Sequence, residues 1–226
     1  MKVLVAAAHA DDEVLGCGGV IARLVDEGND VRVVFFTNGV GARKGQLPVD
    51  VIDRRSAAEQ AIGILGAKLL SSFSFSDNAM DGMPIIEIIR EFEDVLRGFE
   101  PEVLFTHHAG DLNVDHRLVH EVVMTSCRPQ PDSGVREIYS FEVASSTGWS
   151  SPSMGNSFQP QRFIDISNTW DRKQKALEAY SQEMRAYPHA RSIEAMEALV
   201  KYRGSQVGMV MAEAFVVERQ VIKELL

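Results

Sequence analysis

A histidine and three acidic residues stand together near the start of the chain, directly after a short apolar segment. Residues 3–8 are expected to form a buried strand, and the run His9–Glu13 follows them. Buried charges need a partner or a metal to offset their desolvation, and open α/β sheets bind ligands at the carboxyl ends of their strands. The spacing of His9 and Asp12 suits one ion, which leaves Asp11 free for proton transfer. A helix N-cap is the alternative, but a cap needs only one carboxylate.

A second polar cluster follows another expected strand, at residues 101–106. Its members are His107, His108, Asp111, Asn113, Asp115, His116 and His120. A helix is expected to start near Asp115, with His116 and His120 one turn apart on it. Clusters from two parallel strands can meet at one edge of a sheet, and a His/Asp/His set with an open fourth position is typical of catalytic zinc. Both cysteines lie outside the two clusters, so thiolate ligands are not expected.

The two motifs resemble those of a known family. His9-Ala10-Asp11-Asp12-Glu13 is similar to the His-Pro-Asp-Asp-Glu signature of the PIG-L/LmbE family of zinc-dependent N-deacetylases, and the run from Asn113 to His116 resembles its His/Asn-x-Asp-His motif. Ala10 replaces the usual proline, and Asn113 stands where many members have histidine. Weaker similarity extends over nearly the whole chain, through segments near Arg54 and at residues 77–81, 145–147 and 202–215.

The resemblance implies a catalytic centre. His9, Asp12 and His116 would bind Zn²⁺, with Fe²⁺ as the alternative in vivo, and Asp11 would be the catalytic base. The chemistry of amide hydrolysis asks for the same groups, because a three-ligand zinc lowers the pKa of water to about 7 and polarises a carbonyl. Asp11 could take the proton of that water and pass it to the leaving amine. Asn113 could donate an N–H to the developing oxyanion or to a sugar hydroxyl.

Several other residues are assigned supporting roles. Asp115 is expected to orient His116 or a neighbour. His120 either supports the ligands without touching the ion or is a half-buried histidine with satisfied hydrogen bonds. Arg54 offers a planar fork of donors for vicinal hydroxyls or a phosphate, and Asp77 and Asp81 could accept hydrogen bonds from hydroxyls. A solvated helix face for Arg54 and a simple turn at Asp77 are the alternatives.

The elements that must position these motifs alternate between strand and helix. Strands are expected at residues 3–8, 30–37, 68–75, 103–106, 138–143 and 162–165, with a last apolar stretch at 212–217. Helices are expected at residues 15–27, 51–65, 85–99, 117–127, 169–184 and 192–204. This order predicts βαβ units with right-handed crossovers. We therefore expect one domain, residues 1–226, with a Rossmann-like three-layer α/β fold, a mostly parallel sheet and the site at the C-terminal edge of its strands.

Two stretches between the regular elements have their own interpretation. The run Gly16-Cys17-Gly18-Gly19 begins several residues past the first strand, too late for the tight phosphate-binding turn of a dinucleotide fold. Close packing of a helix against the sheet is expected instead. Residues 144–161 are rich in Ser, Gly and Pro, and they are expected to form a substrate loop. The roles of His107, His108 and the loop around His189 stay open.

Global properties narrow the partners. The net charge of −9 argues against a nucleic-acid backbone as ligand. No apolar run of 18 residues and no N-terminal signal are found, and two cysteines give no disulfide framework. A cytoplasmic enzyme without a membrane span is expected, acting on a small amino-sugar substrate. The resemblance implies a homo-oligomer.

The sequence leaves the exact sugar and its aglycone open. A sugar, a nucleotide sugar or a surface-saccharide precursor with an N-acetyl group fits the resemblance best. An amidase acting on a thiol-sugar conjugate is one alternative. A non-catalytic Rossmann-like protein that binds a nucleotide or a sugar is another, although such a module would have no use for Asp11 beside the ligands.

Overall fold

A seven-stranded sheet forms the centre of the molecule. The computed structural model describes residues 1–37, 48–131, 133–154 and 156–222. The strands are β1 (Lys2–Ala7), β2 (Asp30–Thr37), β3 (Lys68–Phe75), β4 (Val103–His107), β5 (Glu137–Phe141), β6 (Arg162–Asp165) and β7 (Ala212–Gln220). Their order across the sheet is β3-β2-β1-β4-β5-β7-β6. Strands β1 to β5 run parallel, and β7 is antiparallel to both β5 and β6. The expected α/β fold with a mostly parallel sheet is confirmed.

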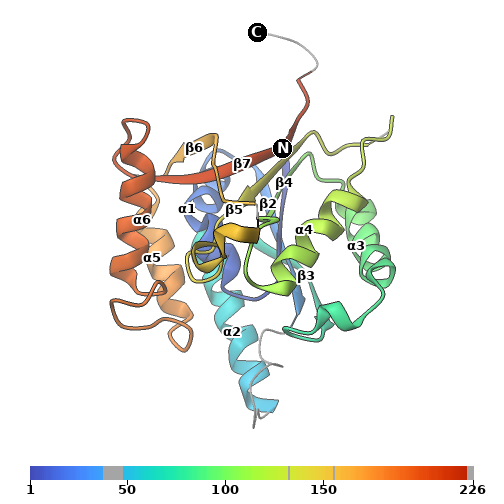
Figure 1. The fold of residues 1–226 in the computed structure, drawn as a ribbon, viewed down its shortest axis with the longest axis horizontal. Helices are drawn as coiled ribbons and strands as arrows, with labels where there is room; N and C mark the ends of the chain where they lie inside the picture. Colours follow the sequence, from blue (N-terminus) through green and yellow to red (C-terminus); the bar gives the residue numbers. More distant parts are fainter. Residues whose placement is uncertain (38–47, 132, 155, 223–226) are drawn as a thin grey trace.

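Helices cover both faces of this sheet (Figure 1). They are α1 (Asp12–Asp26), α2 (Pro48–Leu65), α3 (Ile85–Phe99), α4 (Val114–Ser126), α5 (Trp170–Ala179) and α6 (Ile193–Ser205). One apolar core joins the sheet to α1, α2, α5 and α6, and a second joins it to α3 and α4. The three layers that the sequence predicts are therefore present.

Strand β1 shows how the sequence builds the centre of this sandwich. Val3, Val5 and Ala7 face the core on the α1 side, whereas Leu4 and Ala6 face the core on the α3 side. All five residues are fully buried. Because helices cover both faces of a parallel sheet, its inner strands are continuous apolar runs without polar alternation. A charged run that follows such a strand directly is therefore positioned at the sheet edge by the strand itself.

The observed bounds lie within three residues of the expected ones in every element except α5, which shows the largest difference. Strands β2, β3 and β6 and helix α3 agree at both ends with the sequence-based ranges. Helix α5, however, ends at Ala179, five residues before the expected end. The chain that follows turns back toward α1, where the hydroxyl of Tyr180 donates to Glu13 (2.6 Å) and Glu183 pairs with Arg54. These long-range polar contacts replace the last helical turn.

Helix α1 packs unusually close to the sheet and is broken in its middle. A Cβ at Gly16 would lie 2.2 Å from the Phe141 ring, and one at Gly19 would lie 2.8 Å from Ile166. The glycines therefore permit close packing, as expected from their position in the sequence. Cys17 has non-helical dihedral angles (φ −146°, ψ 24°) that divide the helix into two parts. The first part carries the acidic motif.

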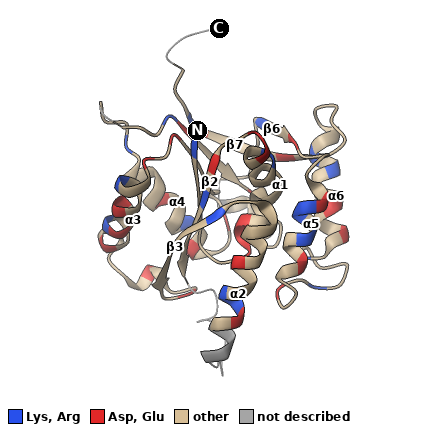
Figure 2. Ribbon diagram, turned by 180° about the vertical axis from the view of Figure 1, so that it is seen from behind, with Lys and Arg blue, Asp and Glu red and all other residues tan. Residues whose placement is uncertain are grey.

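The charged residues on the surface helices are of mixed sign. Figure 2 shows Lys or Arg close to Asp or Glu along α3, α5 and α6. Within the described ranges, no helix combines the length and the apolar character needed to cross a membrane.

Candidate metal centre and active site

The two polar clusters come together where β1 and β4 end. These strands are neighbours in the sheet, although the chain order reverses between them. His9 lies in the turn from β1 into α1, Asp12 is the first residue of α1, and His116 lies in the first turn of α4, which follows β4. This reversal point is where open α/β sheets form a crevice for ligands. The expected position of the site at the C-terminal strand edge is thereby observed.

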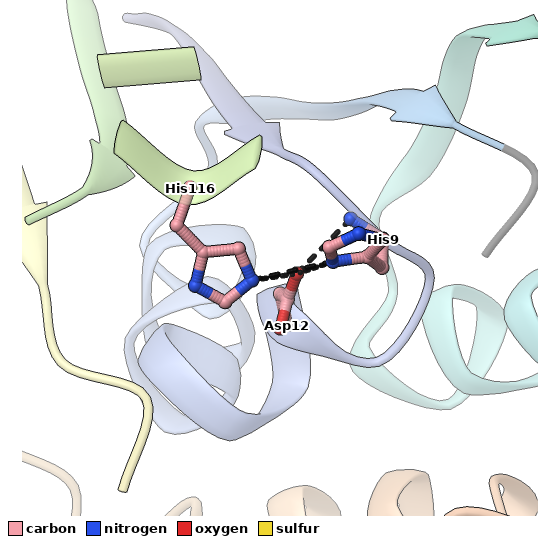
Figure 3. A group of neighbouring side chains, drawn as sticks. All are labelled: His9, Asp12 and His116. Carbon is pink, nitrogen blue, oxygen red and sulfur yellow. Dashed lines mark hydrogen bonds and ion pairs between the residues drawn. The ribbon is translucent and has the colours of Figure 1, made fainter. Parts of the chain in front are cut away.

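Three donor atoms converge at this edge (Figure 3). His9 Nδ1 lies 3.0 Å from Asp12 Oδ2, and His116 Nε2 lies 3.1 Å from the same oxygen. The two imidazole nitrogens are 3.2 Å apart. All three side chains are buried, and Asp12 is fully so. Two nitrogens and one carboxylate oxygen therefore form a compact triangle.

The triangle has the size and composition of a metal site. Ligands at about 2.0–2.1 Å from a tetrahedral zinc lie about 3.3 Å from one another, close to the separations observed here. The second oxygen of Asp12, Oδ1, is buried and has no hydrogen-bond partner within the described part of the chain. A buried carboxylate oxygen without a donor is costly. The set of His9, Asp12 and His116 therefore fits one divalent ion.

Carboxylates hold both imidazoles from behind. His9 Nε2 lies 3.1 Å from Asp115 Oδ2 and 3.1 Å from Asp77 Oδ1, while His116 Nδ1 lies 3.2 Å from Asp111 Oδ1. His9, Asp77 and Asp115 form a second potential metal-binding group. A metal-bound histidine usually gives its other N–H to a carboxylate, so this group is the rear support of His9. Asp115 therefore supports His9 and not His116, whose ring is supported by Asp111 instead.

Asp111 is itself firmly held, although sequence reasoning gave it no role. Its Oδ2 accepts hydrogen bonds from the hydroxyls of Ser146 (3.0 Å) and Thr147 (2.5 Å), and its Oδ1 accepts the backbone N–H of Asn113 (2.8 Å). Ser146 also lies near His116, with Oγ 3.3 Å from Nδ1. Ser146 and Thr147, which follow β5, therefore reach the side chains around the donor triangle. The sequence shows several acidic residues after β4, but it does not show which of them contacts His116.

Opposite charges set the protonation of this centre in the metal-free protein. Burial disfavours the imidazolium, but Asp12 and the hydrogen bond to Asp111 outweigh it and raise the pKa of His116 to about 9. The pKa of His9 is also raised, because its carboxylate partners outweigh burial. Burial works against the charged form of Asp12 as well, yet the protonated ring of His116 and the hydrogen bond from His9 hold its pKa well below the usual range. A metal ion that binds here must displace protons from imidazole.

Asp11 has a strained backbone and two arginine partners. Its φ is 127°, a region that non-glycine residues seldom adopt. Its Oδ2 accepts from Arg191 Nη1 (2.7 Å) and lies 3.4 Å from Arg54 Nη2. Its Oδ1 is buried and has no hydrogen-bond partner among the described residues. Burial raises the pKa of Asp11 although both arginines oppose the shift. One oxygen is thus held in place and the other is available for a proton.

Glu13 supports Asp11 from behind. Its Oε2 accepts the backbone N–H of Asp11 (3.0 Å), and its Oε1 accepts the hydroxyl of Tyr180 (2.6 Å). Burial raises the pKa of Glu13 to about 8. Both carboxyl oxygens are therefore occupied by contacts that fix the strained turn at Asp11.

The two arginines come from distant segments. Arg54 lies in α2, is 8 % exposed and also pairs with Glu183. Arg191 lies between α5 and α6, and its Nε donates to Ser145 Oγ (2.8 Å). Sequence reasoning singled out Arg54 as a substrate contact, whereas it left the role of the loop around His189, which carries Arg191, open.

The remaining expected site residues lie at different distances from the centre. Asn113 is the N-cap of α4: its Oδ1 accepts the N–H of Asp115 (2.9 Å) and its Nδ2 donates to Asn78 Oδ1 (3.0 Å). His120 Nδ1 bonds to the carbonyl of His107 (2.9 Å), so it supports the β4 end without reaching the donor triangle. Asp81 is exposed in a 3-10 turn (Met80–Gly82), and within the described chain it has no polar contact with the centre.

His107 and His108, whose roles the sequence left open, contact different parts of the molecule. His107 Nε2 accepts the backbone N–H of Ala8 (2.9 Å), and its ring stacks on His116 with centroids 3.9 Å apart. Burial holds the pKa of His107 well below its usual value, so its ring is neutral. His108 instead bonds through Nε2 to the carbonyl of Asn156 (3.0 Å) and anchors the segment 144–161.

Comparison with known proteins finds deacetylases among the relatives. The chain is 28 % identical over 173 residues to the uncharacterized deacetylase YaiS of Escherichia coli, covering 74 % of this chain and 83 % of that protein. It is 27 % identical over 246 residues to a 1D-myo-inositol 2-acetamido-2-deoxy-alpha-D-glucopyranoside deacetylase of Gordonia bronchialis, covering 82 % and 85 %. A 4-oxalmesaconate hydratase of Pseudomonas putida is 28 % identical over 197 residues, covering 78 % and 72 %.

Solved structures share the fold at lower identity. The structure of GalB, a 4-carboxy-2-hydroxymuconate hydratase from Pseudomonas putida, has a TM-score of 0.79 at 23 % identity and covers 100 % of this chain and 99 % of its own. The N,N'-diacetylchitobiose deacetylase of Pyrococcus horikoshii has a TM-score of 0.77 at 20 % identity, covering 96 % and 84 %. A model of the PIG-L family, described as GlcNAc-PI de-N-acetylase, matches residues 4–127, the half of the chain that supplies all three atoms of the donor triangle. With both motifs inside this match and deacetylases among its relatives, the chain belongs to the PIG-L family.

Proposed function

We propose that this protein is a metal-dependent hydrolase that removes the acetyl group from an N-acetylglucosamine-type sugar or sugar conjugate. The observation that carries this proposal is the convergence of His9 Nδ1, Asp12 Oδ2 and His116 Nε2 next to Asp11. The deacetylase relatives support the reaction type, and one of them is named for a 2-acetamido-2-deoxy-glucopyranoside substrate.

The donor set favours zinc, with Fe²⁺ as the alternative in vivo, because both ions accept imidazole nitrogen and carboxylate oxygen. When bound, such an ion would polarise the amide carbonyl and lower the pKa of a water molecule. The chain's own contribution is to fix three ligands and leave coordination positions open. Asp115 and Asp111 hold the rings of His9 and His116 in the required orientation.

Asp11 is proposed as the group that moves the proton. Arg191 and Arg54 stabilise its carboxylate against burial, and its Oδ1 has no hydrogen-bond partner within the described residues. This oxygen can accept a proton from the attacking water and deliver it to the amine nitrogen, which cannot leave as an anion. The Glu13 contact to the Asp11 N–H keeps the carboxylate in place between the two steps.

Asn113 and three other polar side chains are proposed to contact the substrate. Oδ1 of Asn113 accepts the helix-cap hydrogen bond and one of its N–H groups donates to Asn78, so its second N–H is the proposed donor to the developing oxyanion or to a hydroxyl. Arg54, Asp77 and Asp81 are proposed to bind sugar hydroxyls. Asp81 is the exposed member of this group, whereas Arg54 and Asp77 are buried at the centre.

Release of amine and acetate tests the proposal directly. The zinc-loaded protein is incubated with N-acetylglucosamine, its β-1,4 dimer, a nucleotide-linked form and a thiol-sugar conjugate, and both products are quantified. Equal amounts of amine and acetate from at least one sugar are expected, with the Asp11→Asn protein as the control for contaminating activity. Stoichiometric metal without any product from the whole panel would overturn the proposal.

A hydratase is the second candidate. The hydratase relative is 28 % identical over most of this chain, and the two guanidinium groups of Arg54 and Arg191 at Asp11 are of the kind that binds carboxylates. Such an enzyme would add water across a carbon–carbon double bond of an unsaturated polycarboxylate. Loss of the ultraviolet absorbance of a conjugated enoate, without amine release from any sugar, would favour this function.

A further inference from the structure

His107 lies between the two chain segments that carry the expected metal ligands. It is the last residue of β4 and is fully buried. Its Nε2 accepts the backbone N–H of Ala8 (2.9 Å), the residue that directly precedes His9. Its ring stacks on the ring of His116, with the centroids 3.9 Å apart and an interplanar angle of 22°. One side chain therefore contacts both the chain just after β1 and the first turn of α4.

The bond to Ala8 anchors the His107 ring at a fixed point of the sheet edge. The last backbone pair between β1 and β4 joins Val5 to Phe105, so this side-chain bond continues the contact of the two strands beyond their ladder. The carbonyl of Ala8 in turn accepts the N–H (2.9 Å) and the hydroxyl (3.1 Å) of Thr37, which ends β2. Both backbone groups of Ala8 are therefore held, and His107 can move little relative to the sheet.

The stacking contact restrains the ring of His116 in a way that its hydrogen bond does not. Asp111 Oδ1 lies 3.2 Å from His116 Nδ1, but a hydrogen bond tolerates a tilt of about 30° away from linearity. A flat ring in van der Waals contact opposes such a tilt, because tilting brings some atoms of the two rings too close together and separates the others. The ring of His9 is inclined by 47° at a centroid distance of 5.2 Å, so it offers no parallel face. His107 therefore provides the flat face against which the plane of His116 is held.

The imidazole of His107 meets two demands that an apolar ring could not meet together. A backbone N–H can only donate, so Nε2 carries no hydrogen and the ring proton is on Nδ1. Nδ1 is buried and has no hydrogen-bond partner among the described residues, while the Phe141 ring lies against the imidazole at a centroid distance of 4.8 Å. A buried N–H without an acceptor costs free energy that a phenyl ring would not. Packing alone does not explain this cost, but the need for an acceptor at Ala8 does.

We propose that His107 is a positioning residue of the metal centre, which sets the plane of the His116 ring and so aims its Nε2 at the ion. His107 does not bind the ion itself, because its own Nε2 is occupied by the Ala8 N–H. The flat face of the ring performs the positioning, and the bond to Ala8 holds that face in place. This inference rests on the metal dependence of the proposed function.

Two substitutions separate the flat face from the acceptor, and zinc affinity measured by chelator competition tells them apart. His107→Gln keeps an acceptor for the Ala8 N–H but removes the ring, so the zinc dissociation constant should rise about 10- to 100-fold, the range for residues that orient metal ligands. His107→Phe keeps the ring face but leaves the Ala8 N–H without an acceptor. Its zinc affinity should stay close to that of the parent protein, whereas the urea midpoint of the metal-free protein should fall.

A neighbouring histidine provides the matched control. His108→Gln makes the same exchange one residue further along the chain, where the side chain bonds to Asn156 and not to the centre, so it should leave the zinc affinity unchanged. The visible absorption of the Co²⁺-loaded protein adds a direct report on ligand geometry. His107→Gln should alter this spectrum, whereas His107→Phe should keep the spectrum of the parent protein.

Zinc affinity requires no turnover, so these measurements separate failure of this inference from failure of the proposed function. Unchanged zinc affinity in His107→Gln would overturn the inference, whether or not the parent protein releases amine. Equal losses in His107→Gln and His107→Phe would overturn it as well, since they would identify His107 as a ligand. Phe141→Leu, which loosens the His107 ring but removes no polar contact of the centre, is the second variant should His107→Gln fail to fold. A smaller rise of the dissociation constant is expected there, and the absence of a rise would contradict the inference.

Discussion

Helix α1 is in contact with two buried charged clusters that differ in how completely their polar atoms are satisfied. The open cluster consists of His9, Asp11, Asp12 and His116 at the start of the helix. The closed cluster consists of Lys173 and Glu213 beside its break. Both lie almost completely inside the protein. In the open cluster, one buried oxygen of Asp11 and one of Asp12 have no hydrogen-bond partner among the described residues. In the closed cluster, every buried polar side-chain atom of Lys173 and Glu213 has a partner within the described chain.

The closed cluster repairs the break in the helix. Glu213 accepts the N–H groups of Gly19 (2.9 Å) and Val20 (2.7 Å), which the kink at Cys17 would leave without a partner. Lys173 Nζ donates to Glu213 Oε1 (2.6 Å) and to the carbonyl of Leu15 (3.0 Å). Each charge therefore has its counter-charge and its hydrogen bonds within the fold.

The comparison shows that complete or incomplete hydrogen bonding distinguishes buried charged residues that stabilise the fold from those that can bind a ligand. A buried ion pair can be tolerated when its hydrogen bonds are complete. Buried acceptors that stay without donors cost free energy, and at the start of α1 they lie beside three converging ligand atoms. The incomplete cluster is therefore the one expected to gain a ligand, and the following predictions test the contrast.

The largest effect is expected when a ligand is removed from the open cluster. His116→Ala should abolish both stoichiometric metal binding and activity, because Asp12 and His9 alone leave only two donors. Metal analysis of the purified protein measures this result. His108→Gln is the matched control, since His108 lies on the same segment but bonds to Asn156. Full metal occupancy in His116→Ala would contradict the assignment.

The next largest effect separates the base from the ligands. Asp11→Asn should retain the metal and lower kcat by about 10²–10⁴, the range for loss of general acid–base catalysis. Asparagine has nearly the shape of aspartate, and the Glu13 contact to the backbone N–H at this position remains, so the turn should stay intact. Asp26→Asn at the far end of α1 is the control. Near-normal turnover would assign the proton transfer to another group.

In the closed cluster, the loss should appear in stability and not in metal binding. Lys173→Met leaves the Glu213 carboxylate buried without a cation, so the free energy of unfolding should fall by about 3–5 kcal/mol. Urea titration measures the change, and metal analysis of the folded protein should still give one ion. Lys201→Met, which removes an exposed pair with Glu197, should cost at most about 1 kcal/mol. Loss of metal in Lys173→Met would show that the clusters are not independent.

Asn113 lies at the boundary between the two kinds of role, because it caps a helix and is a proposed donor. Asn113→Ala should lower both the melting temperature and kcat, the latter by about 10²–10³ if the amide faces the oxyanion. Asn113→Asp keeps the capping oxygen but removes the N–H donor, so it should restore stability and not kcat. Recovery of kcat in Asn113→Asp would mean that Asn113 acts only as the helix cap and not as a hydrogen-bond donor to the substrate.

The smallest effect is a pH dependence of metal affinity. In the metal-free protein the raised pKa of His116, about 9, keeps its ring protonated at neutral pH. Because a metal must displace this proton, the dissociation constant should fall about tenfold per pH unit from pH 6 to 8 for each proton released. Chelator competition at several pH values measures it. A constant affinity over this range would mean that the imidazoles are already neutral.

Much of the fold could be predicted from local patterns, whereas the candidate ligands were singled out by the resemblance of two motifs to a known family. The apolar runs of β1 and β4 show only that a polar cluster follows each strand, and parallel strands bring these clusters to one edge. The bounds of β2, β3, β6 and α3 follow from apolar periodicity and turn residues. At the end of α5 the predicted bound was wrong, because long-range polar contacts of Tyr180 and Glu183 replace the helix there.

The residues around Asp11 could not be found in this way. Arg191 lies 180 residues away in the chain from the carboxylate that it contacts, and the loop that carries it has no periodic pattern. The same holds for the pairing of Asp111 with His116 and of Asp115 with His9, since several acids of one loop were equally placed.

The sequence by itself determined that two polar clusters follow β1 and β4, and the resemblance of their motifs to a known family singled out His9, Asp12 and His116 as candidate ligands. It also determined the layered α/β fold, through the alternation of apolar strands and helices. Only the tertiary structure decided which polar atoms are satisfied and which remain open, as the contrast between Glu213 and Asp12 shows. The physical reason is that strand and helix patterns depend on neighbours in the chain, whereas hydrogen-bond satisfaction depends on groups that meet only after packing.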